Sequence, residues 1–314
     1  MSEPVSLLDA AYGAARWGWY LAAFLVLGAG SYAPFFFPGR RSLPHTDASV
    51  AGEVTRRTAR IGFSAGLALL LFALLRFYCQ ARVLNEPGEP LTADFLRAVL
   101  GSAWGRGWRL QALAAVLVTA AFALARRGAR IPWLLAVLLS LAVGATAGMT
   151  GHAGTVKSGP GGLLIDAAHV TLGGWWLGGL GVMVLAGLAA ARSVGPERKP
   201  AILQSLVGDF SRRAQIAAPL AIALGIWLAA RYLGWGWPLH LSGSYRWMLV
   251  GKLAVLAGVG ALGAFNWRVT QPRLTQPGGE PRLRRFSALE LWFGIVLLGV
   301  TAVLVSLPLP EGGM

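Results

Sequence analysis

The stretch from Leu163 to Ala191 reads LLIDAAHVTLGGWWLGGLGVMVLAGLAAA, and its ionisable side chains are Asp166 and His169. An α-helix needs about 20 mainly apolar residues to cross the roughly 30 Å of hydrocarbon in a lipid bilayer. This stretch is long enough to cross with a tilt. It therefore predicts a membrane-spanning helix.

Apolar runs of the same kind occur along the whole chain. The predicted spans are Trp17–Phe37, Ile61–Tyr78, Gly107–Ala125, Ile131–Gly151, Leu163–Ala191, Ala214–Ala230, Trp247–Phe265 and Phe286–Leu307. The expected fold is all-α: a polytopic membrane protein built as a bundle of eight transmembrane helices in a single membrane domain. A short interfacial helix is expected around Leu91–Leu100, between the second and third spans.

The composition agrees with this class of protein. Hydrophobic residues make up 55% of the chain, charged residues make up 13%, and the mean hydropathy is +0.58. Because about a quarter of the residues in a soluble domain are charged, this balance excludes ordinary soluble, disordered and collagen-like chains. The single cysteine, Cys79, excludes an internal disulfide bond.

The positions of the basic residues explain the formal net charge of +15. Eighteen of the 28 Lys and Arg residues fall in alternate segments between spans, against nine on the opposite side. These segments are residues 40–60, 126–130, 192–213 and 268–285. Because cytoplasmic loops carry the excess of Lys and Arg, both termini are expected to be extracytoplasmic. Charges scattered over four loops favour anchoring to the anionic lipid bilayer, with no nucleic acid as a partner.

Polar residues inside spans are costly and are therefore candidates for function. The fourth span ends with Met149 and His152, and the fifth begins with Asp166 and His169. Each pair is spaced by three residues, which places its members on one helix face, and the short loop between the spans makes the two helices antiparallel neighbours. The predicted topology puts all four at the outer membrane boundary. Two imidazoles, a carboxylate and a thioether suit a transition metal, and the thioether favours Cu(I).

Structural explanations compete with a metal site. A histidine near a helix end is often an ordinary interfacial residue, and Asp166 has a candidate partner in Lys252 of the seventh span. Met248, near the same outer boundary, is either a further soft ligand or a packing residue. Glu290 in the eighth span is expected to play a structural role, paired with Arg284, Arg285 or Asn266.

Several short motifs follow one another in the order found in one known family. Gly151-His152-Ala153, Asp166-x-x-His169 and Trp176-Leu177-Gly178-Gly179-Leu180 resemble the copper resistance protein D (CopD) family of inner-membrane proteins. The later positions that resemble the same family are Phe210-Ser211, Tyr245 to Lys252, Asn266-x-Arg268, Pro272-x-Leu274, Leu289-Glu290-Leu291 and Ser306-Leu307-Pro308. The resemblance covers residues 145–308, whereas the N-terminal helices in residues 1–144 show a generic likeness.

The resemblance implies a multi-pass protein of the bacterial inner (cytoplasmic) membrane that imports or delivers copper. It also implies a separate, CopC-like periplasmic copper chaperone as a partner. The residues themselves indicate a location at the periplasmic face, with His152, Asp166 and His169 as ligands and Met149 and Met248 as soft ligands, for Cu(I) or Cu(II).

Other functions remain open at this stage. In one, His152 and His169 ligate a b-type haem and the protein carries electrons. In another, the protein delivers copper as an assembly factor and does not transport it. No enzyme is expected, because the sequence has no nucleophile elbow, phosphate-binding loop or paired carboxylate site.

Overall fold

A computed structural model of the chain describes residues 6–32, 48–150, 159–234 and 243–307. These residues form helices and turns, and no β-strand occurs among them. Short 3₁₀ or π-helical turns, labelled η, interrupt or end several helices. In chain order the elements are α1 (Leu7–Ser31), α3 (Ala48–Leu84), α4 (Ala93–Gly101), α5 (Ala103–Ala125), α6 (Arg130–Thr146), η2 (Ala147–Thr150), α8 (Gly159–Gly173), η3 (Gly174–Gly178), α9 (Gly179–Val182), η4 (Met183–Gly187), α10 (Leu188–Ala190), η5 (Ala191–Ser193), α11 (Lys199–Leu233), α13 (Gly243–Phe265), η6 (Asn266–Thr270), η7 (Gln271–Arg273) and α14 (Gly279–Leu304).

Seven helical segments of the described chain are long and apolar enough to cross a bilayer. They are Ser49–Leu84, Ala103–Ala125, Arg130–Thr150, Gly161–Ser193, Lys199–Leu233, Gly243–Arg273 and Gly279–Leu304. They correspond to the second to eighth predicted spans, which confirms the all-helical membrane fold. α1 has 25 residues and covers most of the first predicted span, but it is not one of the seven. The count of eight spans therefore stays a prediction.

Two helices are much longer than their predicted spans. α3 has 37 residues and α11 has 35, and each continues into a segment rich in arginine. Salt bridges one turn apart support these polar extensions: Glu53 pairs with Arg56 and Arg57 on α3, and Asp209 pairs with Arg212 on α11. Hydropathy marks where the apolar residues end, but backbone hydrogen bonding continues past that point.

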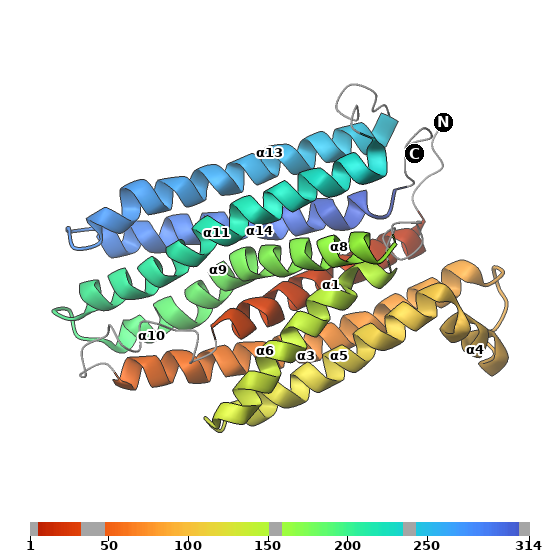
Figure 1. Cartoon of the computed structure of the whole chain (residues 1–314), viewed down its shortest axis with the longest axis horizontal. Coiled ribbons are helices and arrows are strands. Elements are labelled where there is room, and N and C mark those ends of the chain that lie inside the picture. Colours follow the sequence, from red (N-terminus) through yellow and green to blue (C-terminus); the bar gives the residue numbers. More distant parts are fainter. Residues whose placement is uncertain (1–5, 33–47, 151–158, 235–242, 308–314) are drawn as a thin grey trace.

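The centre of the molecule is formed by α1 and the segment from α8 to α10 (Figure 1). On one side of this pair lie α11, α13 and α14, and on the other side lie α3, α5 and α6. α1 contacts elements of both groups, namely α3, α6 and α14. The fifth predicted span and α1 therefore form the layer that joins the two groups of helices.

Glycines allow the close contact between these central helices. Gly28 of α1 and Gly178 of η3 approach so closely that a Cβ atom on either would overlap backbone atoms of the opposite helix. Gly174, one turn before Gly178, makes room for the side chain of Leu27. Small residues four positions apart are a common device for close helix packing in membranes. They fix where α1 crosses the fifth span.

Both ends of the described chain lie at the same end of the bundle. Near the start of α1, Nη1 of Arg16 donates a hydrogen bond to Oγ of Ser306, just after α14. α4 also lies toward this end of the molecule (Figure 1). The side chain of Thr92 caps α4, which begins at Ala93 and ends at Gly101. It takes the place of the short helix expected around Leu91–Leu100.

Candidate functional site

A cavity of about 350 Å³ lies between α1, α8, α11, α13 and α14. Most of its wall is apolar and includes Trp176 and Leu177 of η3. The ionisable side chains of the described residues that line it include Arg16, Tyr20, Arg76, Asp166, His169 and Lys252. Two of the predicted site residues, Asp166 and His169, thus face one internal space.

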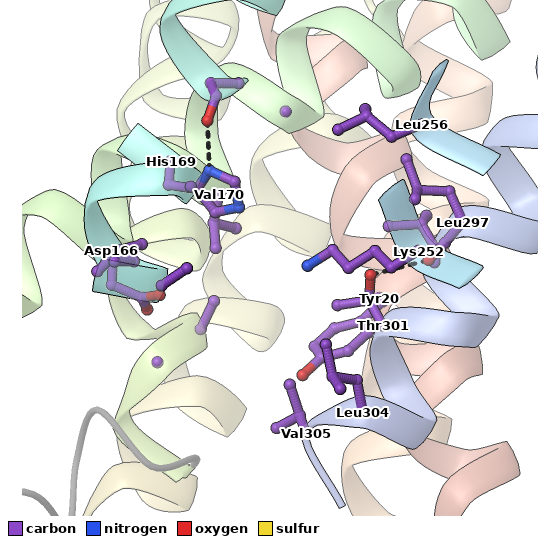
Figure 2. Close-up of a pocket in the computed structure, with 18 of the residues that line it drawn as sticks. Tyr20, Asp166, His169, Val170, Lys252, Leu256, Leu297, Thr301, Leu304 and Val305 are labelled. Carbon is purple, nitrogen blue, oxygen red and sulfur yellow. Dashed lines mark hydrogen bonds between the residues drawn. The ribbon is translucent and has the colours of Figure 1, made fainter. Parts of the chain in front are cut away.

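A hydrogen bond to the backbone of a neighbouring helix orients His169. Its Nδ1 atom lies 2.8 Å from the carbonyl oxygen of Ala221 in α11. Because a carbonyl can only accept, Nδ1 carries the proton and donates it, and Nε2 keeps its lone pair. The ring nitrogen not engaged with Ala221 lies on the cavity side (Figure 2). Anchoring one nitrogen and leaving the other available is the usual arrangement of a metal-binding histidine.

Gly225 of α11 makes this orientation of His169 sterically feasible. A Cβ atom at Gly225 would lie 2.9 Å from Cε1 of His169, which is closer than carbon atoms tolerate. The absence of a side chain at position 225 therefore lets the imidazole approach α11 and reach the carbonyl of Ala221, four residues earlier. Sequence patterns did not identify this glycine, because its role depends on the packing of α8 against α11.

Asp166 and Lys252 face the cavity from different helices. Asp166 lies on α8, three residues before His169, and Lys252 lies on α13. Their side chains lie on opposite sides of the space rather than in direct contact (Figure 2). The predicted pairing of Asp166 with Lys252 thus becomes an attraction across the cavity, and the volume between the two charges is available to a ligand.

A buried arginine lies at the edge of the cavity. Arg76 of α3 is 3% exposed. It donates from Nη1 to Oε1 of Gln111, at 3.2 Å, and from Nη2 to Oγ1 of Thr150, at 2.7 Å. Its guanidinium also lies 5.3 Å from the ring centre of Trp19. This cluster ties α1, α3 and α5 to η2, the turn that precedes His152.

The other predicted ligands lie elsewhere or cannot be placed. His152 is outside the described residues, although Thr150, two positions earlier, lines the cavity. Met149 does not line it: its backbone and Cβ lie against Gly107 of α5. Met248 packs beside the small cluster formed by Leu249 and Leu304. In the part of the chain that the structure describes, no three His, Cys, Asp or Glu side chains form a group that could hold a metal.

One buried carboxylate on α14, outside the cavity lining, is expected from the sequence to play a structural role. Glu290 of α14 is 3% exposed, and its Oε2 accepts a hydrogen bond of 2.8 Å from Nδ2 of Asn266. Arg284 instead pairs with Glu280 and donates to the carbonyl of Leu188. Of the three expected partners of Glu290, the structure therefore shows Asn266.

Comparison with known proteins adds evidence on the whole chain. Residues 204–304 match the sequence profile described as Copper resistance protein D, and residues 7–163 match the profile described as Copper resistance protein D-like, N-terminal domain. The second match alone covers half of the chain and includes the helices in which motifs had shown a generic likeness.

A curated relative is similar along nearly the whole sequence. It is the copper transport protein CutJ of Bacillus subtilis (strain 168), which is 25% identical over 298 residues, or 93% of this chain. The chain spans about half, 51%, of the length of that relative. No solved structure matches.

Proposed function

The chain belongs to the copper resistance protein D family, and from this premise we propose that it binds copper in the cavity beside His169 and imports or delivers it. The observation that carries the proposal is the geometry of His169, whose Nδ1 is anchored to Ala221 and whose Nε2 has a free lone pair. Imidazole suits copper. No catalytic reaction is assigned to the protein.

Further ligands come from residues near the cavity. Asp166 faces the same space as His169, and His152 follows Thr150 of the cavity wall by two residues. We propose these three as the ligand set. Met149 and Met248 are proposed as soft donors that reach copper after a local rearrangement, because neither lines the cavity as described. Thioethers would favour Cu(I), whereas a set rich in imidazole and carboxylate also accepts Cu(II).

The proposed orientation places this cavity at the extracytoplasmic face of the bacterial inner membrane. The cavity lies at the same end as Arg16 and Val305, which line it. Both ends of the described chain meet there. This arrangement supports an even number of spans, with α1 added to the seven other segments. The basic segments between other spans then lie on the cytoplasmic side. A separate periplasmic copper chaperone is proposed as the donor, because copper must reach the outer mouth of the cavity.

Copper content measured on purified protein tests the ligand assignment. We expect the wild type to retain copper after dialysis, and we expect His169→Ala and His152→Ala to lose most of it. His45→Ala is the matched control, because it removes an imidazole that the sequence places on the opposite side of the membrane. Equal copper contents in the wild type and the three variants would contradict the proposed ligand assignment.

Two further measurements separate this proposal from its alternatives. Copper uptake into sealed proteoliposomes distinguishes import from binding and delivery, which would give copper-loaded protein without uptake. An absorption spectrum of the purified protein tests the haem alternative, in which His152 and His169 are axial ligands. A Soret band that is present in the wild type and disappears in His169→Ala would show that the bound group is haem and not copper.

A further inference from the structure

The cavity is lined by more cationic than anionic side chains. Among the described residues that line it, Arg16, Arg76 and Lys252 are basic and Asp166 is acidic. The guanidinium groups of both arginines stay protonated in proteins. A copper cation that enters without other ligands would add positive charge to a site that already has an excess, in an apolar wall that screens charge poorly.

Arg76 shows that this positive charge lacks a carboxylate partner nearby. Its hydrogen bonds to Gln111 and Thr150 go to neutral acceptors. Its Nε is buried and has no hydrogen-bond partner in the described part of the chain. A buried cation is costly unless an opposite charge compensates it. The edge of the cavity is therefore electrostatically suited to an anion.

Lys252 faces the position where copper would bind. Its amine projects into the cavity from α13, on the side opposite His169 and Asp166 (Figure 2). A lysine cannot ligate a metal while it is protonated, because an ammonium group has no lone pair. It can, however, hold an anion that is itself bound to the metal. The geometry thus provides a donor atom for copper on one wall and a cation for a negatively charged group on the other.

We propose that the cavity takes up copper together with a small monovalent anion of the halide class. Copper lies on Nε2 of His169, and the anion bridges the space between copper and the ammonium of Lys252. This inference rests on the proposed function, because it specifies the form in which copper occupies the same cavity. Each halide lowers the positive charge of the loaded site by one and places a negative charge closer to Lys252 than Asp166, which faces it across the cavity.

X-ray absorption at the copper edge tests the proposal directly, with bromide as the probe. Full-length protein is loaded anaerobically with Cu(I) in bromide buffer and, in parallel, in methanesulfonate buffer of equal ionic strength. We expect a copper–bromine scattering shell in the wild type. We expect the shell to persist in Lys252→Arg, which keeps the cation, and to disappear in Lys252→Met.

Lys199→Met is the matched control. Lys199 lies at the start of α11 and pairs with Glu280 at 3.6 Å, away from the cavity lining, so its replacement should leave the bromine shell unchanged. Lys252→Gln provides a second neutral variant if Lys252→Met does not give monodisperse protein. Absence of the bromine shell from the wild-type spectrum is decisive by itself, because that result requires no variant to fold.

The outcomes separate this inference from the proposed function. Copper bound by the wild type without a bromine shell, or a bromine shell that persists in both neutral variants of Lys252, overturns the inference. Either result leaves copper on His169 if His169→Ala still loses the metal. If wild type and His169→Ala bind the same amount of copper, the proposed function itself fails.

Discussion

At the scale of single residues, the candidate site depends on how one imidazole is held. His169 comes from α8, but the carbonyl that orients it comes from Ala221 of α11, and the space for its ring comes from Gly225. In a metal-binding histidine, the group that accepts a hydrogen bond from the other ring nitrogen fixes the tautomer and orientation of the ring. Copper affinity should therefore respond to changes in α11, even though no residue of α11 is proposed as a ligand.

Replacement of Gly225 by alanine should weaken copper binding. The new Cβ would lie 2.9 Å from Cε1 of His169, so the ring must move away from Ala221. Loss of such a partner lowers metal affinity by roughly 10- to 100-fold, and we expect a decrease of about tenfold. Competition with a copper chelator measures it. Gly251→Ala, whose Cβ has no atom within 4 Å, is the control. Equal affinities for the two variants would contradict the anchoring role of Ala221.

Part of this site could be predicted from the sequence, because helix geometry alone determines it. The spacing of three residues places Asp166 and His169 on one helix face, and both do line the cavity. The positions of Met149 and Arg76 could not be predicted in the same way. Met149 lies on a 3₁₀ turn, where the side-chain period differs from that of an α-helix. The partners of Arg76 come from three other elements, α1, α5 and η2.

At the scale of elements, the helix that decides the fold is irregular. Two π-helical turns, Gly174–Gly178 and Met183–Gly187, interrupt the segment that begins with α8. Each π turn inserts an extra residue into the helical repeat, so the face presented after it rotates relative to the face before it. Hydropathy along residues 163–191 predicts a span but contains no signal for this rotation. The sequence therefore does not indicate which helices contact the two halves of this segment.

The crossing of α1 over η3 should be intolerant of even one added carbon. We expect Gly178→Ala to lower the free energy of unfolding by about 3 kcal/mol, because the new Cβ would overlap the carbonyl of Phe24 in α1. Denaturation of the purified protein in detergent measures this loss. Gly187→Ala, in the same span, is the control, since its Cβ would meet Leu206 and Met183 at ordinary distances of 3.8 and 3.9 Å. Similar stabilities for the two variants would show that the backbones can separate at little cost.

At the scale of the whole molecule, the positions of seven membrane-spanning segments were easier to predict than the lengths of their helices. Apolar runs identify spans because unpaired backbone groups are excluded from hydrocarbon, which leaves the helix as the way across. The same rule does not define where a helix ends in water, and α3 and α11 continue through arginine-rich segments. Which helices enclose the cavity could not be predicted from the sequence either, because α1 is far from α8, α11, α13 and α14 along the chain.

The orientation of the molecule would decide from which side copper enters the proposed site. The cavity shares its end with Arg16 and Ser306, and the positive-inside rule predicts that this end lies outside the cytoplasm. We expect alkaline phosphatase fused after the last residue to be active in intact cells. The same enzyme fused after Gly195, between Arg192 and Arg198, should be inactive. Green fluorescent protein, which fluoresces when it folds in the cytoplasm, should give the reverse pattern at the two positions. A fluorescent C-terminal fusion with inactive phosphatase would place the cavity mouth on the cytoplasmic side, and copper would then be loaded from within the cell.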